Sequence, residues 1–314
     1  MNYLIDLEQK IFMKHDFKIT ILIILLFLLA HVVGLWLLMN NFVVEVTESG
    51  EYIPVHEETV MGPRPEMSGH ETIFLILASL GFGTAAILII IKLRRFIFWK
   101  ALFFIASFMS MYIALGVLLM PVTSLLLAFI IAVWKIKKPN IFVHNLSEIL
   151  MYSGLAVMLV PMLTVEWAAI LLLLISAYDA FAVYRSRHMV KIAKALTETG
   201  MFAGFFVPYK SSVDITGKNL DYTCKKGRTT SAILGGGDVV FPLLFTGTVL
   251  ERMITIGFDK LTAFTYALII PVGLSFLLLS FFVLAKKGKY YPAMPFLTAG
   301  CLIFYLVLMF LIGV

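Results

Sequence analysis

Long apolar runs alternate along the chain with short clusters of Lys and Arg. A helix needs about 20 apolar residues to cross a bilayer. Because basic clusters mark one side of the membrane, the chain must cross an even number of times between two of them. This rule predicts nine transmembrane helices. Three are single spans, at 17–39, 71–91 and 292–313. The other six form three helical hairpins, at 96–134, 146–184 and 229–285.

Each predicted hairpin has an evident turn. The turns are expected at Met120-Pro121, at Pro161 to Val165 and at Glu251 to Lys260. The second arm of the first hairpin, about 121–134, would be only about 21 Å long at about 1.5 Å per residue. The fourth span is therefore expected to be shorter than the hydrocarbon core, which is about 30 Å thick.

Composition supports a polytopic membrane protein and excludes other classes. Of the 314 residues, 61% are hydrophobic and 14% are charged, and the mean hydropathy is +0.98. These values exclude a water-soluble enzyme and a disordered chain. The net charge of +6 is explained by basic loops that set orientation, so no nucleic-acid partner is expected.

The charge pattern predicts which side each loop occupies. The basic clusters would be cytoplasmic, and the outer segments carry only Arg64, Arg252 and Lys260. With nine spans, the N-terminus lies inside and the C-terminus outside. The predicted organisation is a block of helices 1–6 at 1–184, a cytoplasmic loop at 185–228, and helices 7–9 at 229–314.

The cytoplasmic loop contains an apolar stretch, Met201 to Pro208. Two interpretations are open. It could lie on the membrane surface, or it could form a strand that pairs with an extended partner peptide.

Carboxylates inside a membrane are candidates for a functional role, since insertion at mid-bilayer costs about 2.5–3.5 kcal/mol. Glu148 and Glu166 begin their spans, so they can reach an interface and are expected to be structural. Asp179 and Asp238 lie deeper, about 9 Å and 15 Å from the cytoplasmic ends of spans six and seven if both helices are regular. The glycine run Gly235-Gly236-Gly237 could unwind span seven and close that gap, although such a run also serves close helix packing.

Two facing aspartates in one half of the membrane suit one chemistry. Carboxyl groups in close contact cannot both ionise, so they share a proton. The ionised group can take a proton from water while the protonated one polarises a peptide carbonyl. Neither residue can be assigned as the base, and no metal or cofactor is required.

Other intramembrane protease motifs are incomplete. A zinc protease needs His-Glu-x-x-His, and the runs from His56 and from His70 both lack the second His. A rhomboid-like serine protease needs Gly-x-Ser-Gly, and the runs at Ser68 and at Ser153 both lack the first Gly.

Three short motifs resemble those of the presenilin and signal peptide peptidase family of intramembrane aspartyl proteases. Tyr178-Asp179 in span six resembles the Tyr-Asp motif of the family, and Gly235-Gly236-Gly237-Asp238 in span seven fits Gly-x-Gly-Asp. Pro292-Ala293-Met294 resembles Pro-Ala-Leu, with Met in place of Leu. The length is similar to that of the compact archaeal presenilin homologues.

The resemblance implies an all-α fold of nine helices and a role for each motif. Asp179 and Asp238 would be the catalytic pair, and Pro292 to Met294 would shape the site. Phe206, Val207 and Pro208 would bind an unwound substrate as a strand.

The prediction is therefore a multi-pass protein of the cell membrane, with its aspartates in the cytoplasmic half. It would hydrolyse transmembrane-segment substrates in the lipid bilayer, and the sequence does not require partner subunits. The alternatives are a cation channel or transporter that uses the two aspartates, and a structural scaffold.

Overall fold

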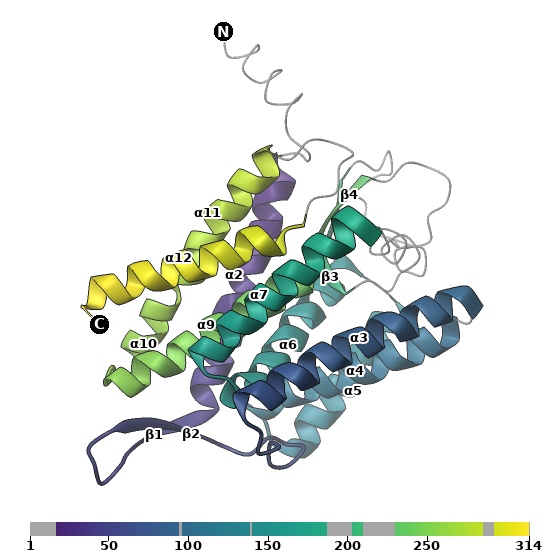
Figure 1. The fold of residues 1–314 in the computed structure, drawn as a ribbon. Coiled ribbons are helices and arrows are strands. Elements are labelled where there is room, and N and C mark those ends of the chain that lie inside the picture. The colour runs from purple at the N-terminus through teal and green to yellow at the C-terminus, as the bar shows by residue number, and fades with distance from the viewer. Residues whose placement is uncertain are drawn as a thin grey trace.

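The chain forms an elongated bundle of helices with two small hairpins of β-strand (Figure 1). The computed structural model describes residues 17–93, 96–138, 140–186, 203–209, 230–284 and 292–313. The α-helices are α2 (Phe17–Asn40), α3 (Gly69–Leu93), α4 (Phe96–Gly116), α5 (Pro121–Lys137), α6 (Ile141–Leu159), α7 (Val165–Phe181), α9 (Gly237–Ile256), α10 (Lys260–Ala267), α11 (Ile269–Leu284) and α12 (Met294–Ile312). A 3-10 turn, η1 (Val160–Met162), precedes α7, and a π-turn, η2 (Ala182–Ser186), follows it.

The helices confirm a mostly helical membrane protein. Within the described ranges, eight helical segments are long and apolar enough to cross a bilayer, with α10 and α11 together forming one of them. The fourth predicted span, which is not among these eight, corresponds to α5, whose 17 residues make it about 26 Å long. The three predicted turns lie between α4 and α5, at η1, and between α9 and α10.

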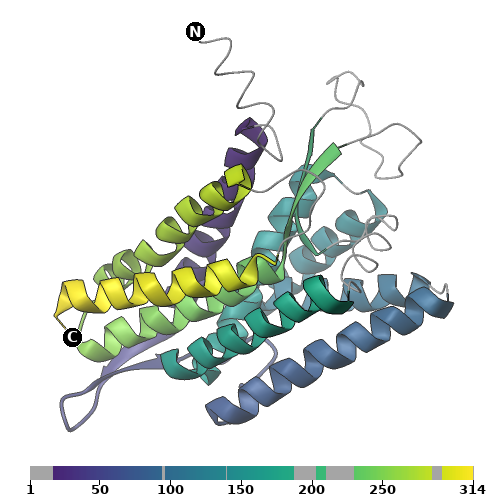
Figure 2. The ribbon, with the colours of Figure 1, turned by 45° about the horizontal axis from the view of Figure 1, so that its top comes forward.

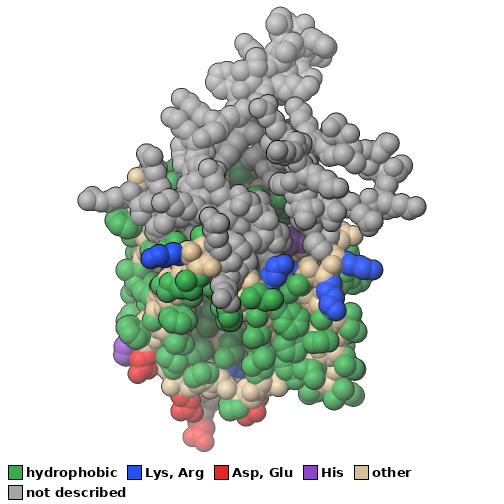
Figure 3. Space-filling view, turned by 90° about the vertical axis from the view of Figure 1, so that its right-hand side faces the viewer, with side chains coloured by type: hydrophobic (Ala, Val, Ile, Leu, Met, Phe, Trp, Pro, Cys, Tyr) green, Lys and Arg blue, Asp and Glu red, His purple; other side chains and the backbone are tan. Residues whose placement is uncertain are grey.

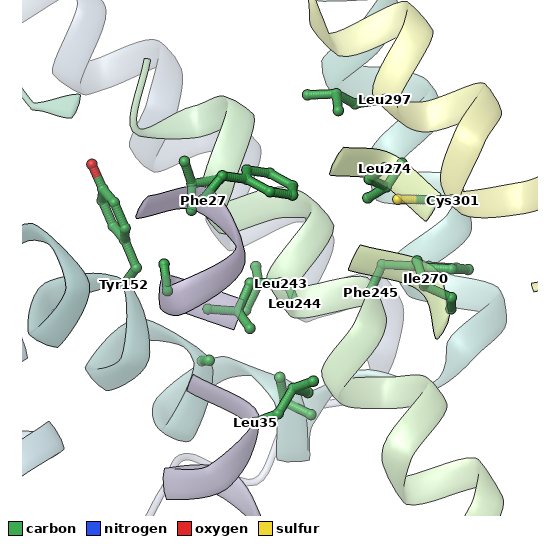
Figure 4. Packing of buried hydrophobic residues seen from close by; sticks show 14 of the residues in the cluster. Phe27, Leu35, Tyr152, Leu243, Leu244, Phe245, Ile270, Leu274, Leu297 and Cys301 are labelled. Carbon is green, nitrogen blue, oxygen red and sulfur yellow. The ribbon is translucent and has the colours of Figure 1, made fainter. Parts of the chain in front are cut away.

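The buried core lies around α9. Leu243, Leu244 and Phe245 of this helix are almost fully buried, and they pack between residues of α2 and residues of α11 and α12 (Figure 4). By contrast, large apolar side chains such as Phe82 on α3 are 79% exposed. Green apolar atoms dominate the side of the bundle shown in Figure 3, as a lipid-facing surface requires.

A β-hairpin caps one end of the bundle. Strands β1 (Phe42–Val46) and β2 (Tyr52–His56) pair antiparallel. The hairpin is tied to the bundle at two points: His56 Nε2 lies 3.0 Å from Glu251 Oε1 on α9, and Lys260 donates to the carbonyl of Phe42. No strand was predicted in this outer segment, although the apolar run Phe42-Val43-Val44 before Ser49-Gly50 is a hairpin signal.

A second hairpin lies at the opposite end of the bundle. Strands β3 (Gly204–Tyr209) and β4 (Thr230–Gly235) pair antiparallel, with Gly204 opposite Gly235. Figure 2 shows β4 leading directly into α9. The expectation that span seven is helical from residue 229 is therefore wrong, because 230–235 is a strand and the helix begins at Gly237.

Candidate active site

Two helix ends bring the aspartates to the same place. Asp179 lies in the last turn of α7, which packs against α9. Asp238 lies in the first turn of α9, where Gly236 occupies the N-cap position. Span seven does not begin as a regular helix, because β4 precedes α9. Both side chains are partly exposed, and the two carboxyl groups interact electrostatically.

Backbone groups from two other segments contact the carboxyl groups. Asp179 Oδ2 accepts a hydrogen bond from the backbone N–H of Met294, at 3.3 Å. The backbone of Gly235 hydrogen-bonds Asp238. A side chain at Gly235 would place its Cβ 3.1 Å from Asp238 Oδ2, so glycine leaves the carboxyl group the room that it occupies.

The Pro292-Ala293-Met294 motif lies beside Asp179. Pro292 and Met294 are buried, and Ala293 occupies the N-cap position of α12. One turn later, Thr298 donates a hydrogen bond to the carbonyl of Leu172 on α7, at 3.3 Å. The motif therefore fixes the start of α12 beside the carboxyl group of Asp179.

Tyr178 turns toward a different helix. Its hydroxyl lies 3.3 Å from Thr84 Oγ1 on α3. Tyr178 therefore joins α7 to α3 immediately beside Asp179.

The stretch Phe206-Val207-Pro208 is the middle of β3. Val207 is 4% exposed and belongs to the core. The backbone of Phe206 exchanges two hydrogen bonds of 3.0 Å with the side chain of Asn145 on α6. The outer edge of β3 is therefore covered by α6 at this point.

A buried polar cluster that was not predicted from the sequence lies beside the second hairpin. Glu148 was expected at an interface, but its side chain is fully buried and forms an ion pair of 2.6 Å with Lys135. Tyr152, which follows Glu148 by one helical turn, donates to it at 2.6 Å. The spacing of His144, Glu148 and Tyr152 at i, i+4 and i+8 was the available signal, since such residues share one helix face.

Tyr152 connects this cluster to the aspartates. A Cβ placed on Gly236 would lie 2.9 Å from the Tyr152 hydroxyl oxygen. Tyr152 also interacts electrostatically with both Glu148 and Asp238. The N-cap glycine of α9 therefore allows close approach of the tyrosine.

No metal-binding cluster occurs in the part of the chain that the structure describes: nowhere do three or more His, Cys, Asp or Glu side chains gather in a way that could hold an ion.

Replacement of Gly236 by Ala should impair this site. The added methyl group must displace Tyr152 or the start of α9, because its distance to the hydroxyl oxygen is below van der Waals contact. A displacement of about 1 Å can cost about 100-fold in rate. We expect peptide cleavage to fall by about ten- to hundredfold, measured as kcat on a membrane-segment peptide. Gly81→Ala on α3 is the control, since nothing lies within 4 Å of the Cβ that it would gain. Equal losses in both variants would contradict the expectation.

The chain is similar to known proteins in sequence and in fold. The family described as signal-peptide peptidase, presenilin aspartyl protease matches residues 43–314. Two solved structures of a presenilin family intramembrane aspartate protease, in space groups C222 and P2, each superpose with a TM-score of 0.55. The first is 18% identical and covers 93% of this chain and 99% of its own. The second is 21% identical and covers 92% and 96%. No curated protein sequence matches the chain.

Proposed function

The chain belongs to the signal-peptide peptidase and presenilin family of intramembrane aspartyl proteases, and from this premise we propose that Asp179 and Asp238 are its catalytic pair. The observation that carries the proposal is the electrostatic interaction between the two carboxyl groups, one at the end of α7 and one at the start of α9, beside the Met294 N–H. Three segments that are distant in sequence converge there, and each carries one of the motifs of the family.

The proposed reaction uses water and one shared proton. The ionised carboxylate takes a proton from water while the water oxygen attacks the carbonyl carbon of the peptide. The protonated carboxyl group stabilises the carbonyl oxygen of the tetrahedral intermediate. When the C–N bond breaks, a proton passes to the leaving nitrogen. The products are a carboxylic acid and an amine, and the pair again holds one proton between them.

The second hairpin supplies a place for an extended substrate. In the register of β3 and β4, Ile233 lies opposite Phe206, whose own backbone groups bond to Asn145. This is a non-hydrogen-bonded pair, so the backbone groups of Ile233 point away from β3. We therefore place the unwound substrate along the outer edge of β4, with Phe206, Val207 and Pro208 as the supporting strand.

The charge distribution supports an orientation with the catalytic pair toward the cytoplasm. Blue Lys and Arg atoms gather toward one end of the face in Figure 3, and red Asp and Glu atoms gather at the other. The described basic residues Lys92, Lys100, Lys137 and Lys138 lie at loops or helix ends. The positive-inside rule then places the N-terminus inside and favours substrates whose N-terminus lies outside.

A cation channel has less support from the described residues. A conduction path would need polar groups that continue along α9 beyond Asp238. Thr246 and Thr248 are buried, but their hydroxyl groups donate to carbonyls of their own helix. Both hydroxyl groups are therefore already paired within α9.

The experiment that tests the proposal is cleavage of a fluorogenic membrane-segment peptide by the purified protein in detergent. A transition-state mimic with a hydroxyl group in place of the scissile carbonyl should inhibit it competitively, because that hydroxyl binds between the two carboxyl groups. A matched compound without the hydroxyl is the control and should bind at least about tenfold more weakly. Cleavage that both compounds leave unchanged would contradict an aspartyl mechanism.

A further inference from the structure

Besides the two aspartates, a pair of opposite charges lies inside the bundle. Lys135 lies near the end of α5 and Glu148 lies in α6, and their side chains are 3% and 0% exposed. Lys135 also lies 4.9 Å from the Phe103 ring centroid and 3.2 Å from Met151 Sδ. Replacing a buried ion pair by apolar groups is often neutral for stability, so stability alone gives little reason for this one.

Glu148 accepts two further hydrogen bonds, one of them from the second hairpin. Besides Lys135, its carboxylate accepts from the Tyr152 hydroxyl at 2.6 Å and from the backbone N–H of Gly204 at 3.1 Å. A carboxylate can only accept, and here its two oxygens satisfy three donors. One of those donors is the first residue of β3.

Neighbouring side chains of α6 continue this contact along the strand. His144 Nε2 donates to the carbonyl of Gly204 at 2.8 Å. Asn145 bonds both backbone groups of Phe206, two residues farther along β3. Alternate residues of a strand turn their backbone groups to the same edge. One face of α6 therefore takes the place of a neighbouring strand on this edge.

The hairpin transmits the position of Gly204 to the catalytic aspartate. Gly204 lies opposite Gly235 in the register, and the N–H of Gly236 donates to the carbonyl of Ala203 at 3.2 Å. Asp238 follows two residues later, in the first turn of α9. A shift of β3 along α6 would therefore move the start of α9 and the carboxyl group of Asp238.

We propose that Glu148 and Asn145 are positioning residues, which hold β3 in register on α6 and thereby place Asp238 and the edge of β4 for reaction. The inference rests on the proposed function for its effect on catalysis. The strand contact itself does not, and it can be measured separately.

The test uses two charge-neutral variants that differ in one acceptor. A single change at Glu148 would leave the Lys135 charge buried without its partner, so Lys135→Met accompanies both. Lys135→Met/Glu148→Gln keeps an oxygen that can accept from Gly204. Lys135→Met/Glu148→Leu removes that oxygen at similar volume. Asn145→Leu is a third variant, which removes the contact with Phe206 without any change in charge. It tests the proposal if the Glu148→Leu double variant does not fold.

Activity and amide exchange are both measured for each folded variant. We expect the Glu148→Leu double variant and Asn145→Leu to lose about ten- to hundredfold in kcat, with KM within about twofold. The Glu148→Gln double variant should keep kcat within about threefold of wild type. Hydrogen exchange of the segment 203–209 should be at least about tenfold faster in the variants that lack an acceptor. A merely structural role would lower the unfolding temperature without separating kcat from KM.

The outcomes distinguish the inference from the proposed function. Equal kcat and equal exchange in the two double variants, with wild-type behaviour of Asn145→Leu, would overturn the positioning role. Wild-type protein that cleaves no peptide, or Asp238→Asn that cleaves like wild type, would overturn the proposed function instead. In that case the exchange of the segment 203–209 alone decides whether Glu148 and Asn145 hold the strand.

Discussion

Replacement of Asp238 by Asn should abolish peptide cleavage while the protein remains folded. Asparagine keeps the shape of the side chain, but it can neither take a proton from water nor share one with Asp179. General acid–base catalysis contributes about 10²–10⁴-fold to a rate, so we expect kcat to fall by at least about 10³-fold. Asp179→Asn should give a similar loss, since the two carboxyl groups act as one unit. The measurement is cleavage of a membrane-segment peptide in detergent.

Asp259→Asn is the matched control for this result. Asp259 caps the start of α10, where its carboxylate accepts from the N–H groups of Leu261 and Thr262 at 3.1 Å. Asparagine serves as well as aspartate in an N-cap, and the residue lies at the far end of α9 from Asp238. We expect wild-type cleavage from this variant. Activity that survives both Asp179→Asn and Asp238→Asn would refute the assignment of the site.

Replacement of Gly154 by Ala should destabilise the bundle strongly. A Cβ at this position of α6 would lie 1.9 Å from the carbonyl oxygen of Ser110 on α4. Because this oxygen belongs to the backbone of α4, it cannot move away by a rotamer change as a flexible side chain can. The Ser110 hydroxyl also donates to the carbonyl of Met151 at 2.5 Å, and separation of the helices would break this bond. We expect a loss of at least about 2 kcal/mol in the free energy of unfolding.

Gly81→Ala provides the comparison for Gly154→Ala. Gly81 lies in α3, and nothing is within 4 Å of the Cβ that it would gain. Alanine also favours the helix by up to about 1 kcal/mol over glycine in water, so its unfolding should be unchanged or slightly delayed. Unfolding in a denaturing detergent titration measures both variants. An equal effect at the two positions would contradict the close packing of α4 on α6.

Hydropathy and charge were enough to locate the membrane helices and their turns. The bounds of α4 and α5 fall on either side of the predicted Met120-Pro121 turn, and η1 lies at Pro161. These features are local, because each apolar run has to satisfy its own backbone within the bilayer. The two aspartates were also found locally, since a carboxylate in an apolar run stands out whatever surrounds it.

The strand before α9 was not predictable from the same signals. A short apolar run that precedes glycines is equally consistent with a strand and with a buried helical turn. Its pairing with Gly204 to Tyr209 joins segments about 25 residues apart, and no local pattern sets that register.

Lys135 and Glu148 were missed for a related reason. Lys135 belongs to the run Lys135-Ile136-Lys137-Lys138, which predicts a solvated loop, and Glu148 lies close to the expected start of a span. The structure buries both side chains together. Proximity in sequence to other charges therefore concealed a pair that forms only when α5 packs on α6.

The shortness of α5 has a consequence for the lipid that surrounds it. At about 26 Å, this helix is about 4 Å shorter than an average hydrocarbon core. Its apolar side chains, among them Phe129 and Ile130, are half exposed. The bilayer beside α5 must become thinner to match the helix, at a cost of a fraction of a kcal/mol per Å of mismatch. The protein should therefore partition toward bilayers with shorter acyl chains, where that deformation is smallest.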